Sequence, residues 1–338
     1  MTLKQRVKNM SDTNLLLSVT IGIFIVMYVI AIVGWGDIFA NPTSFFQNLN
    51  LISPKIIVCI GLSIVMISGS IDISVGGVMG LVTMVCAIYL ENNGGNVWIA
   101  VLISLAIGLA FGIVQGFLIA YLEIQPFIVT LAGMFFARGA STIISDVQLN
   151  IRTNEAFNAI KAFSIKLPIG GTIRNTFVPA KMELDTVIML IVLVIAFIAL
   201  QWTKAGRALY AVGGNQQSAL MLGINPKKTK FFAHISCSLL AGIAGFAFLL
   251  HYGNGAANNA MGFEMEAIAA SIIGGTLLSG GVGNVIGTFF GALSVHTIRL
   301  IVSAVGLSEP WWTNITIAVM ICVFLVIQSI IIANKRKA

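Results

Sequence analysis

Long runs without charged residues are the feature that most restricts how this chain can fold. Residues 14–35, 97–122, 186–203 and 310–334 carry no charge. Each run is long enough to cross a hydrocarbon layer about 30 Å thick as a helix of about 20 residues. The chain is 58% hydrophobic and 9% charged, well outside the usual composition of soluble domains. The sequence therefore predicts a membrane protein.

Two longer runs must each hold two spans. Residues 267–306 contain one charge, Arg299, and as a single helix they would be about 60 Å long. The glycines at 274–275 and 280–283 predict a reversal there, because glycine permits tight turns. The run 56–90 is expected to break in the same way at SGSID (68–72). The result is an all-α, polytopic fold in one domain, residues 1–338, with about ten spans near 14–35, 52–70, 74–90, 97–121, 125–146, 184–203, 231–250, 265–280, 283–306 and 311–333.

The basic residues support ten spans. With ten spans both termini lie on one side of the membrane, and basic residues favour the cytoplasmic side. We therefore expect cytoplasmic termini, a cytoplasmic loop over about 204–230 and an external loop over about 147–183. The net charge of +7 then reflects topology and contact with anionic membrane lipid rather than nucleic acid. The basic clusters are Lys4, Arg6 and Lys8; Lys204, Arg207, Lys227, Lys228 and Lys230; and Lys335, Arg336 and Lys337.

Motifs for catalysis, metal binding or nucleotide binding are absent from the sequence. The four cysteines, residues 59, 86, 237 and 322, lie in apolar runs without C-x-x-C spacing, and the three histidines are scattered. The chain has no G-x-x-x-x-G-K-[ST], H-E-x-x-H or G-x-S-x-G motif. We therefore predict no catalytic residue, no metal site and no cofactor in this chain.

Small residues predict close helix packing. Glycines recur every fourth residue at 108, 112 and 116, and again at 283, 287 and 291. Each set forms a stripe along one helix face where another backbone can approach closely. We interpret both stripes as structural packing surfaces of a compact bundle.

Four blocks of the sequence carry a resemblance to a known family: SGSIDISVGGVMG (68–80), IQPFIVTLAGMFFARG (124–139), YAVGGNQQSALMLGI (210–224) and EMEAIAASIIGGTLLSGGVGNVIGT (264–288). In this order they resemble the ribose-type permease subunits of bacterial ABC sugar importers, over nearly the whole chain. TLAGMFFARG, GGTLLSGGVG and SEPWWTNITIA resemble most closely the permeases of galactofuranose-type importers. The resemblance implies a transport subunit of the bacterial inner membrane that moves a pentose or hexose and is not an enzyme.

The resemblance also explains the polar stretch at 210–224. In such importers a cytoplasmic permease loop carries a short coupling helix that docks in a cleft of the ATPase subunit. We expect Asn215 to cap this helix and Gly223 to end it in a left-handed conformation. Related loops often have Glu-Ala-Ala before the glycine, a pattern that is missing here, and an ordinary connecting helix is the alternative. The predicted coupling residues are Asn215, Gln216, Gln217, Ser218, Ala219, Leu222 and Gly223, with Ala219 and Leu222 facing the ATPase.

The implied partners supply what this chain lacks. A separate ATPase subunit would bind ATP and magnesium, and a periplasmic or lipid-anchored sugar-binding protein would dock on the outer loops. A second permease chain would complete the pathway, and the galactofuranose-type likeness favours a sister chain over a second copy. The candidate docking residues for the binding protein are Asn258, Asn259, Glu264 and Glu266.

Charged and polar residues within the spans are the candidates for the sugar pathway. Asp72 either lines the pathway or caps the helix that begins near Ser74. Arg138 and Arg299 either extend to the membrane surface or pair with Asp146 and Glu309. Sugars bind amides, hydroxyls and an aromatic face. The predicted pathway residues are Asp72, Ser74, Gln115, Gln125, Phe127, Thr130 and Arg138.

A transporter of another class fits part of the same pattern. An ion-coupled secondary transporter of a small polar solute also has broken helices and charges within the membrane, often in inverted repeats. The two glycine-rich hairpins at 69–77 and 274–283 would both face the cytoplasm, so they are not equivalent positions of such a repeat. The sequence identifies neither the sugar nor the second permease chain.

Overall fold

A computed structural model describes residues 12–92, 94–173, 176–307 and 309–337, and it is mostly helical, as expected. The N-terminal basic cluster, Lys4, Arg6 and Lys8, lies outside the described residues. The elements are α2 (Asp12–Gly34), α3 (Gly36–Phe39), α4 (Pro42–Ile67), α5 (Val75–Asn92), α6 (Val97–Ala120), α7 (Pro126–Ile144), β1 (Leu149–Asn150), α8 (Glu155–Ala162), β2 (Ser164–Ile173), β3 (Thr176–Glu183), α9 (Leu184–Trp202), α10 (Lys204–Gly214), α11 (Gln216–Met221), α12 (Pro226–Tyr252), β4 (Asn254–Gly255), α13 (Phe263–Ile273), α14 (Val285–Ala304) and α15 (Pro310–Lys337).

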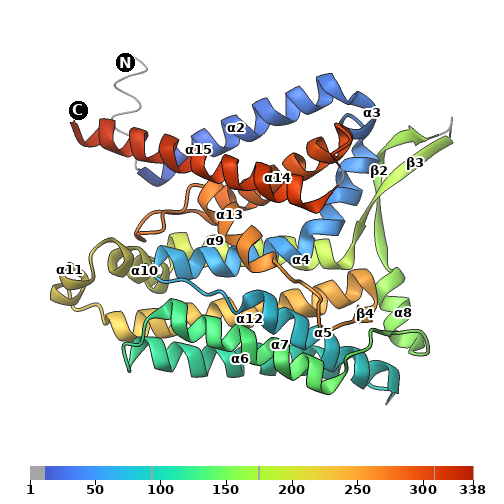
Figure 1. Cartoon of the computed structure of the whole chain (residues 1–338), viewed down its shortest axis with the longest axis horizontal. Helices are drawn as coiled ribbons and strands as arrows, with labels where there is room; N and C mark the ends of the chain where they lie inside the picture. Colours follow the sequence, from blue (N-terminus) through green and yellow to red (C-terminus); the bar gives the residue numbers. More distant parts are fainter. Residues whose placement is uncertain (1–11, 93, 174–175, 308, 338) are drawn as a thin grey trace.

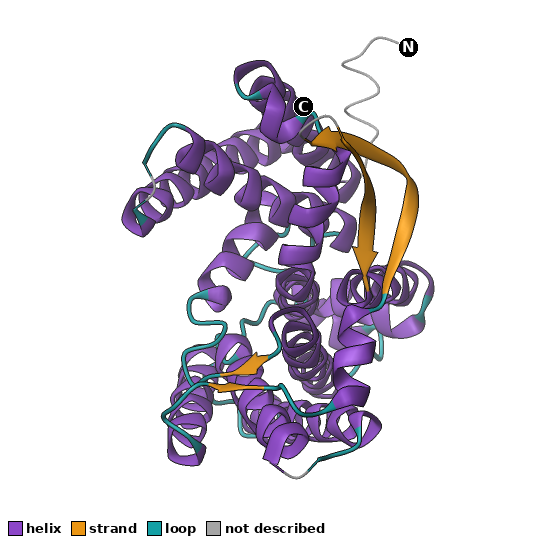
Figure 2. Cartoon of the chain, turned by 90° about the vertical axis from the view of Figure 1, so that its right-hand side faces the viewer, coloured by secondary structure: helices purple, strands orange, loops and turns teal. Residues whose placement is uncertain are grey.

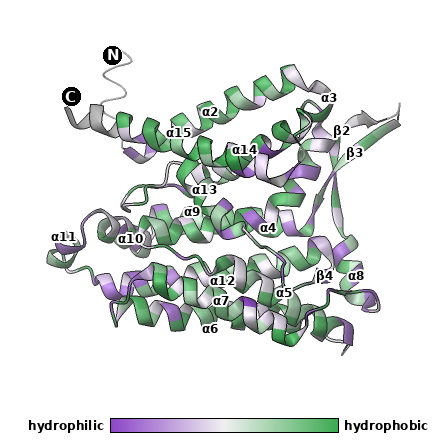
Figure 3. Ribbon diagram, viewed as in Figure 1, coloured by the Kyte–Doolittle hydropathy of each residue, from purple (hydrophilic) through white to green (hydrophobic). Residues whose placement is uncertain are grey.

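The long helices run between two ends of the molecule (Figure 1). One end carries α10 and α11, together with the start of α2 and the end of α15; we call it the α11 end. The other carries the β2–β3 hairpin and α8; we call it the hairpin end. Apolar residues dominate the long helices, whereas polar residues gather around α11 and α8 (Figure 3). The predicted basic loop over 204–230 therefore lies at the opposite end from the predicted external loop.

Nine helices among the described residues are long and apolar enough to span a membrane, and they match nine of the ten predicted spans. The exception is the predicted span 265–280, where α13 is a helix of 11 residues. At 1.5 Å per residue α13 measures about 16 Å, half of a bilayer core. The helix is short because it already ends at Ile273, before a turn with positive φ at Gly275, Gly280 and Gly281.

Helix α4 forms the centre of the bundle, since 94% of its apolar stretch is buried inside the structure. The first glycine stripe packs α6 on α12: a Cβ at Gly108 would lie 2.5 Å from the Ser238 carbonyl oxygen. The second packs α14 on α13, where a Cβ at Gly291 would lie 2.0 Å from the Ala270 carbonyl oxygen. Both distances are too short for any side chain larger than hydrogen. The interpretation of the stripes as packing surfaces is confirmed.

Two irregular segments enter the bundle from opposite ends. Residues 68–74 follow α4 at the α11 end and lead into α5, and residues 253–262 follow α12 at the hairpin end and lead into α13 (Figure 1). The second segment reaches the first turn of α5, where a Cβ at Gly76 would lie 2.9 Å from the Ala260 carbonyl oxygen. The two segments thus enter in opposite directions, one before α5 and one before α13. This inverted arrangement was not apparent from the sequence.

The loop over 147–183 contains strands that the sequence did not predict. Strands β2 and β3 form an antiparallel hairpin that rises from the bundle (Figure 2), and β1 pairs with β4. Helix α4 anchors the hairpin, because Thr43 Oγ1 donates to the Val178 carbonyl at 2.8 Å and Asn50 Nδ2 donates to the Lys181 carbonyl at 2.9 Å. The hairpin is therefore a fixed part of the hairpin end.

Candidate coupling and transport site

Helix α11 has the start that the sequence predicts. Asn215 lies between α10 and α11 in an extended conformation, and its side chain accepts a hydrogen bond from the Ser218 backbone N–H at 2.9 Å. This bond satisfies one of the backbone N–H groups that the first turn of a helix leaves without a partner. Gln216, Gln217 and Ser218 are exposed on this first turn.

The end of α11 also agrees with the prediction. Gly223 has a φ of 80°; its N–H donates to the Leu220 carbonyl at 3.0 Å, and the Ile224 N–H donates to the Ala219 carbonyl at 3.0 Å. This pair of bonds is a Schellman motif, which requires a left-handed residue after the helix. Asn225 then caps α12 through the Lys228 N–H at 3.1 Å. Helix α11 is thus fixed as a separate unit between two caps.

The exposed face of α11 differs from the expected one. Ala219 is 1% exposed, so it faces the protein, whereas Met221 is 88% exposed and Leu220 and Leu222 are also exposed. The i, i+3 spacing of Ala219 and Leu222 therefore does not describe the surface that a partner would meet. The sequence signal for the exposed surface is the run of Leu220, Met221 and Leu222, because three consecutive apolar residues beside a glycine cap form an exposed apolar tip.

Charged side chains support α11 from neighbouring elements. Lys230 Nζ donates to Gln216 Oε1 at 2.9 Å, which links α12 to α11. Lys227 Nζ lies 2.8 Å from Glu123 Oε1, in the loop between α6 and α7. The hydrogen bond from Lys227 lowers the pKa of the exposed Glu123 carboxyl. The first contact ties α12 to α11, and the second ties α12 to the loop between α6 and α7.

Five glycines bring α10 into backbone contact with two distant turns; we call them the glycine junction. They are Gly69, Gly213, Gly214, Gly280 and Gly281. A Cβ at Gly280 would lie 2.7 Å from Gly69 Cα, and one at Gly281 would lie 2.6 Å from Gly214 Cα. A hydrogen bond from the Gly281 N–H to the Ile67 carbonyl, 2.9 Å long, closes the junction. The residues just before α11 therefore touch both the start of the irregular segment 68–74 and the turn between α13 and α14.

Asp72 belongs to a polar cluster inside the bundle. Its side chain is fully buried and accepts from the Ser74 N–H at 2.9 Å, so it does cap the start of α5. It also accepts from Ser238 Oγ at 3.4 Å and lies 3.9 Å from His234 Nδ1. His234 Nε2 in turn lies 2.8 Å from Ser70 Oγ. The cap is therefore not at the membrane surface but in the interior, where irregular backbone needs polar partners.

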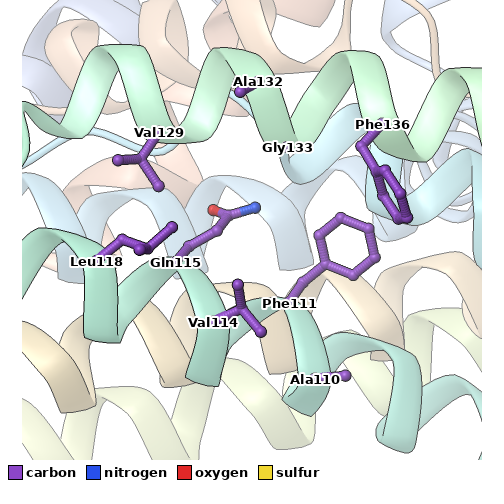
Figure 4. A pocket seen from close by; sticks show the side chains of 9 residues that line it. All are labelled: Ala110, Phe111, Val114, Gln115, Leu118, Val129, Ala132, Gly133 and Phe136. Atoms are coloured by element: carbon purple, nitrogen blue, oxygen red, sulfur yellow. The ribbon is translucent and has the colours of Figure 1, made fainter.

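Gln115 connects this cluster to a groove between α6 and α7 (Figure 4). Ser74 Oγ lies 2.6 Å from Asp72 Oδ1 and 3.1 Å from Gln115 Oε1. The Gln115 Nε2 amide is buried and has no hydrogen-bond partner among the described residues. The groove has a volume of about 430 Å³, and Phe111 and Phe136 form its aromatic wall. The exposed lining of the groove is almost entirely apolar, and the Gln115 amide is buried behind it.

Not all predicted pathway residues join this groove. Gln125 and Phe127 are exposed at the start of α7, at the α11 end. Thr130 is buried, and its hydroxyl donates to the Pro126 carbonyl of its own helix at 2.8 Å. Asp72, Ser74 and Gln115 are therefore the predicted pathway residues that lie together.

Arg138 neither extends to the surface nor pairs with Asp146. It holds the irregular segment 253–262, donating to the carbonyls of Ala257 at 3.1 Å, Asn259 at 2.5 Å and Ala260 at 3.0 Å. Backbone carbonyls at membrane depth need such donors because lipid supplies none. The planar guanidinium reaches several acceptors at once.

Three of the four candidate docking residues lie partly or fully inside the protein. Glu264 is buried, and Glu266 forms ion pairs with Lys55 and Arg299. Asn259 Nδ2 donates to Thr83 Oγ1 at 3.1 Å, which leaves Asn258 as the exposed member of the set. Arg299 thus pairs with Glu266 and not with Glu309.

An apolar bundle with a capped helix at one end and a hairpin at the other is the architecture of a multi-span membrane protein. The sequence of residues 44–325 matches the family described as branched-chain amino acid transport system / permease component. The chain belongs to this family of ABC importer permeases. It is a multi-pass inner-membrane protein and a transport subunit, not an enzyme.

Several curated relatives are similar over most of the chain. The inner membrane ABC transporter permease protein YjfF of Escherichia coli is 34% identical over 94% of this chain and 93% of its own length. The fructose import permease protein FruG of Bifidobacterium longum is 33% identical over 82% and 80%. The ribose import permease protein RbsC of Escherichia coli is 31% identical over 88% of both chains. No solved structure matches the chain. The resemblance to ribose-type sugar permeases is confirmed.

Proposed function

We propose that this chain is the transmembrane subunit of an importer for a monosaccharide, either a pentose or a hexose. A furanose such as galactofuranose is among the candidates. A substrate-binding protein would deliver the sugar, and a separate ATPase subunit that binds ATP and magnesium would drive its entry. The names of the relatives, which include ribose and fructose import permease proteins, support a sugar as the substrate.

The geometry of α11 is the observation that carries this proposal. A short helix between two caps, with an exposed apolar tip formed by Leu220, Met221 and Leu222, fits a cleft in a partner protein. The glycine junction lies directly before it. A displacement of α11 by the ATPase would therefore be passed by backbone contact to the segment 68–74 and to the turn at 274–284. The α11 end would then be cytoplasmic and the hairpin end external.

The sugar would pass beside Gln115. Its unpartnered amide is buried beside the groove between α6 and α7, and its Oε1 contacts Ser74 of the polar cluster around Asp72. Val114 and Phe136 in the groove wall are exposed, so the groove opens on the surface of the chain. A second permease chain would close it, and the likeness to galactofuranose-type importers favours a sister chain over a second copy.

Co-purification tests the proposed assembly. The chain is tagged in its native host, extracted in a mild detergent and analysed by mass spectrometry for every bound subunit. We expect an ATPase subunit, a second permease and, with sugar present, a binding protein. The variant Met221→Asp places a charge on the apolar tip and should lose the ATPase alone. Recovery of the chain without any ATPase, under conditions that retain a known ABC permease complex, would contradict the proposal.

An ion-coupled secondary transporter remains the competing function because the two irregular segments enter from opposite ends, as in inverted repeats. Liposomes that hold the purified chain and no ATP separate the two functions. We expect no sugar accumulation in response to a sodium or proton gradient. Accumulation under either gradient would favour the secondary transporter.

A further inference from the structure

We propose that Glu183, Asp185 and His251 form a binding site for a zinc-type divalent cation at the hairpin end. One ligating atom of each residue lies within 4.8 Å of the other two. His251 Nδ1 is 3.0 Å from Glu183 Oε2 and 3.0 Å from Asp185 Oδ2. The spacing of these residues in the sequence gave no sign of the site, because His251 lies far along the chain from the two carboxylates.

Three separate elements supply the ligands. Glu183 is the last residue of β3, Asp185 lies in the first turn of α9, and His251 lies in the last turn of α12. Asn50 of α4 fixes the chain between the carboxylates, since its Oδ1 accepts from the Glu183 N–H at 3.2 Å and from Thr186 Oγ1 at 2.7 Å. The positions of the ligands are therefore set by the fold before any ion binds.

Two of the ligating atoms are buried without a hydrogen-bond partner. Asp185 is 1% exposed, and its Oδ1 accepts from the Thr186 N–H at 2.9 Å. Its other oxygen, Oδ2, and His251 Nδ1 make no hydrogen bond among the described residues, although they lie 3.0 Å apart. Buried polar atoms are nearly always partnered, so these two atoms call for a water or an ion that completes them.

A protonated His251 would satisfy the site less completely than a cation. The Nδ1 atom carries one hydrogen and can direct it at only one of the two carboxylate oxygens. Directed at Glu183, the hydrogen would leave the buried Asp185 Oδ2 charged and without a donor, at a cost that burial increases. Directed at Asp185, it would leave Glu183, whose side chain is 41% exposed, to the solvent. A divalent cation bound by neutral His251 would contact all three atoms and balance the two negative charges.

The ligand set selects the type of cation. One imidazole nitrogen and two carboxylate oxygens suit Zn²⁺, which takes three protein ligands and a water in open sites. Bonds of about 2.0–2.1 Å in a tetrahedral site place ligand atoms about 3.3 Å apart, within a few tenths of the two 3.0 Å separations. Ca²⁺ requires six to eight oxygens and Mg²⁺ an octahedral oxygen shell, which this set does not offer.

A bound ion would join the base of the β2–β3 hairpin to α9 and α12. The irregular segment 253–262 begins two residues after His251, so the ion would also fix the start of that segment. This inference does not depend on which solute the chain transports. We expect the ion to hold the hairpin end rigid.

Titration of the purified protein tests the site. The full chain is purified in detergent through a tag without histidines, freed of metal with EDTA and titrated with Zn²⁺ in a calorimeter. We expect one Zn²⁺ per chain and a rise in the unfolding temperature that saturates at this ratio, with no such rise from Ca²⁺ or Mg²⁺. Co²⁺ should give the visible absorption of a four-coordinate site. Absence of saturable Zn²⁺ binding to the wild-type chain would overturn the proposal and leave a histidine ion pair.

Variants locate the bound ion. Glu183→Gln, Asp185→Asn and His251→Gln should each weaken Zn²⁺ binding at least about tenfold, since even the loss of a residue that only orients a ligand costs 10–100-fold. Glu155→Gln, which removes an exposed carboxylate from the same end of the chain, should bind as the wild type does. Glu183 is the most exposed of the three ligands, so its variant is the safest for folding. Equal affinity in Glu183→Gln and the wild type would place the ion elsewhere and refute the site.

Discussion

One methyl group at the glycine junction gives the sharpest test of the coupling route. In Gly213→Ala the new Cβ would lie 1.9 Å from the Ile67 carbonyl oxygen and 2.6 Å from the Gly281 nitrogen. Ordinary contact begins at 3.4 Å, so α10 and the end of α4 would have to separate by about 1.5 Å. Both obstructing atoms belong to the backbone, which cannot rotate away as a side chain does.

The expected cost follows from two contributions. Overpacking a tight backbone contact typically costs about 1–3 kcal/mol. Separation also weakens the hydrogen bond from the Gly281 N–H to the Ile67 carbonyl, which is worth about 0.5–1.5 kcal/mol. We therefore expect Gly213→Ala to lose about 2–4 kcal/mol. Gly214→Ala is the matched control, because a Cβ there meets no atom within 4 Å and alanine favours a helix by about 1 kcal/mol over glycine.

Two measurements separate stability from coupling. The unfolding temperature of each purified variant reports the packing cost, and stimulation of the ATPase subunit per folded permease reports the transmission. We expect Gly213→Ala to unfold several degrees below the wild type and to lose most of its stimulation, with Gly214→Ala close to the wild type in both. Equal behaviour of the two alanine variants would refute the tight junction. A low unfolding temperature with full stimulation would refute its role in coupling.

Further predictions concern the cap of α11, the irregular segment and the topology. Gly223→Val should abolish capture of the ATPase subunit without reducing membrane abundance, because a β-branched residue at positive φ costs about 1 kcal/mol or more. Gly223→Asn should retain capture of the ATPase subunit. Equal capture by both variants would count against the role of the cap. Arg138→Lys should speed amide hydrogen exchange over 253–262, since an ammonium replaces fewer of the carbonyl contacts; unchanged exchange would contradict the anchoring role. Cysteines at Ser164 and Lys227 should react with an impermeant reagent from opposite faces of the membrane, and labelling from one face would refute the topology.

The sequence predicts the long spans because their apolar runs exceed the bilayer thickness, and the caps of α11 because Asn215 and Gly223 act through local backbone geometry. It does not predict the depth of the 68–74 break. That break follows α4, and the same residues are compatible with a surface turn and with a buried segment. The positions of the neighbouring helices decide between the two. The burial of Asp72 depends on Ser238 and His234 of α12, more than 160 residues away in the chain.

Residues 253–266, which contain the four candidate docking residues, are predicted from the sequence to form an outer loop. Their real position depends on Arg138, whose donors allow carbonyls to lie inside the bundle. The β2–β3 hairpin was missed for a similar reason, since its strands are fixed by contacts with Thr43 and Asn50 of α4. Local composition indicates a turn or a loop, but long-range contacts decide where it lies.

The shortness of α13 affects how the protein is made. A helix of 11 residues cannot leave the translocon as an independent span, because it covers only about half of the hydrocarbon layer. The carbonyls of the preceding segment accept hydrogen bonds from Arg138 of α7, which is synthesised earlier. The glycine stripe on which α13 packs belongs to α14, which is synthesised later. Residues 253–284 are therefore expected to reach their final position only after α14 has inserted.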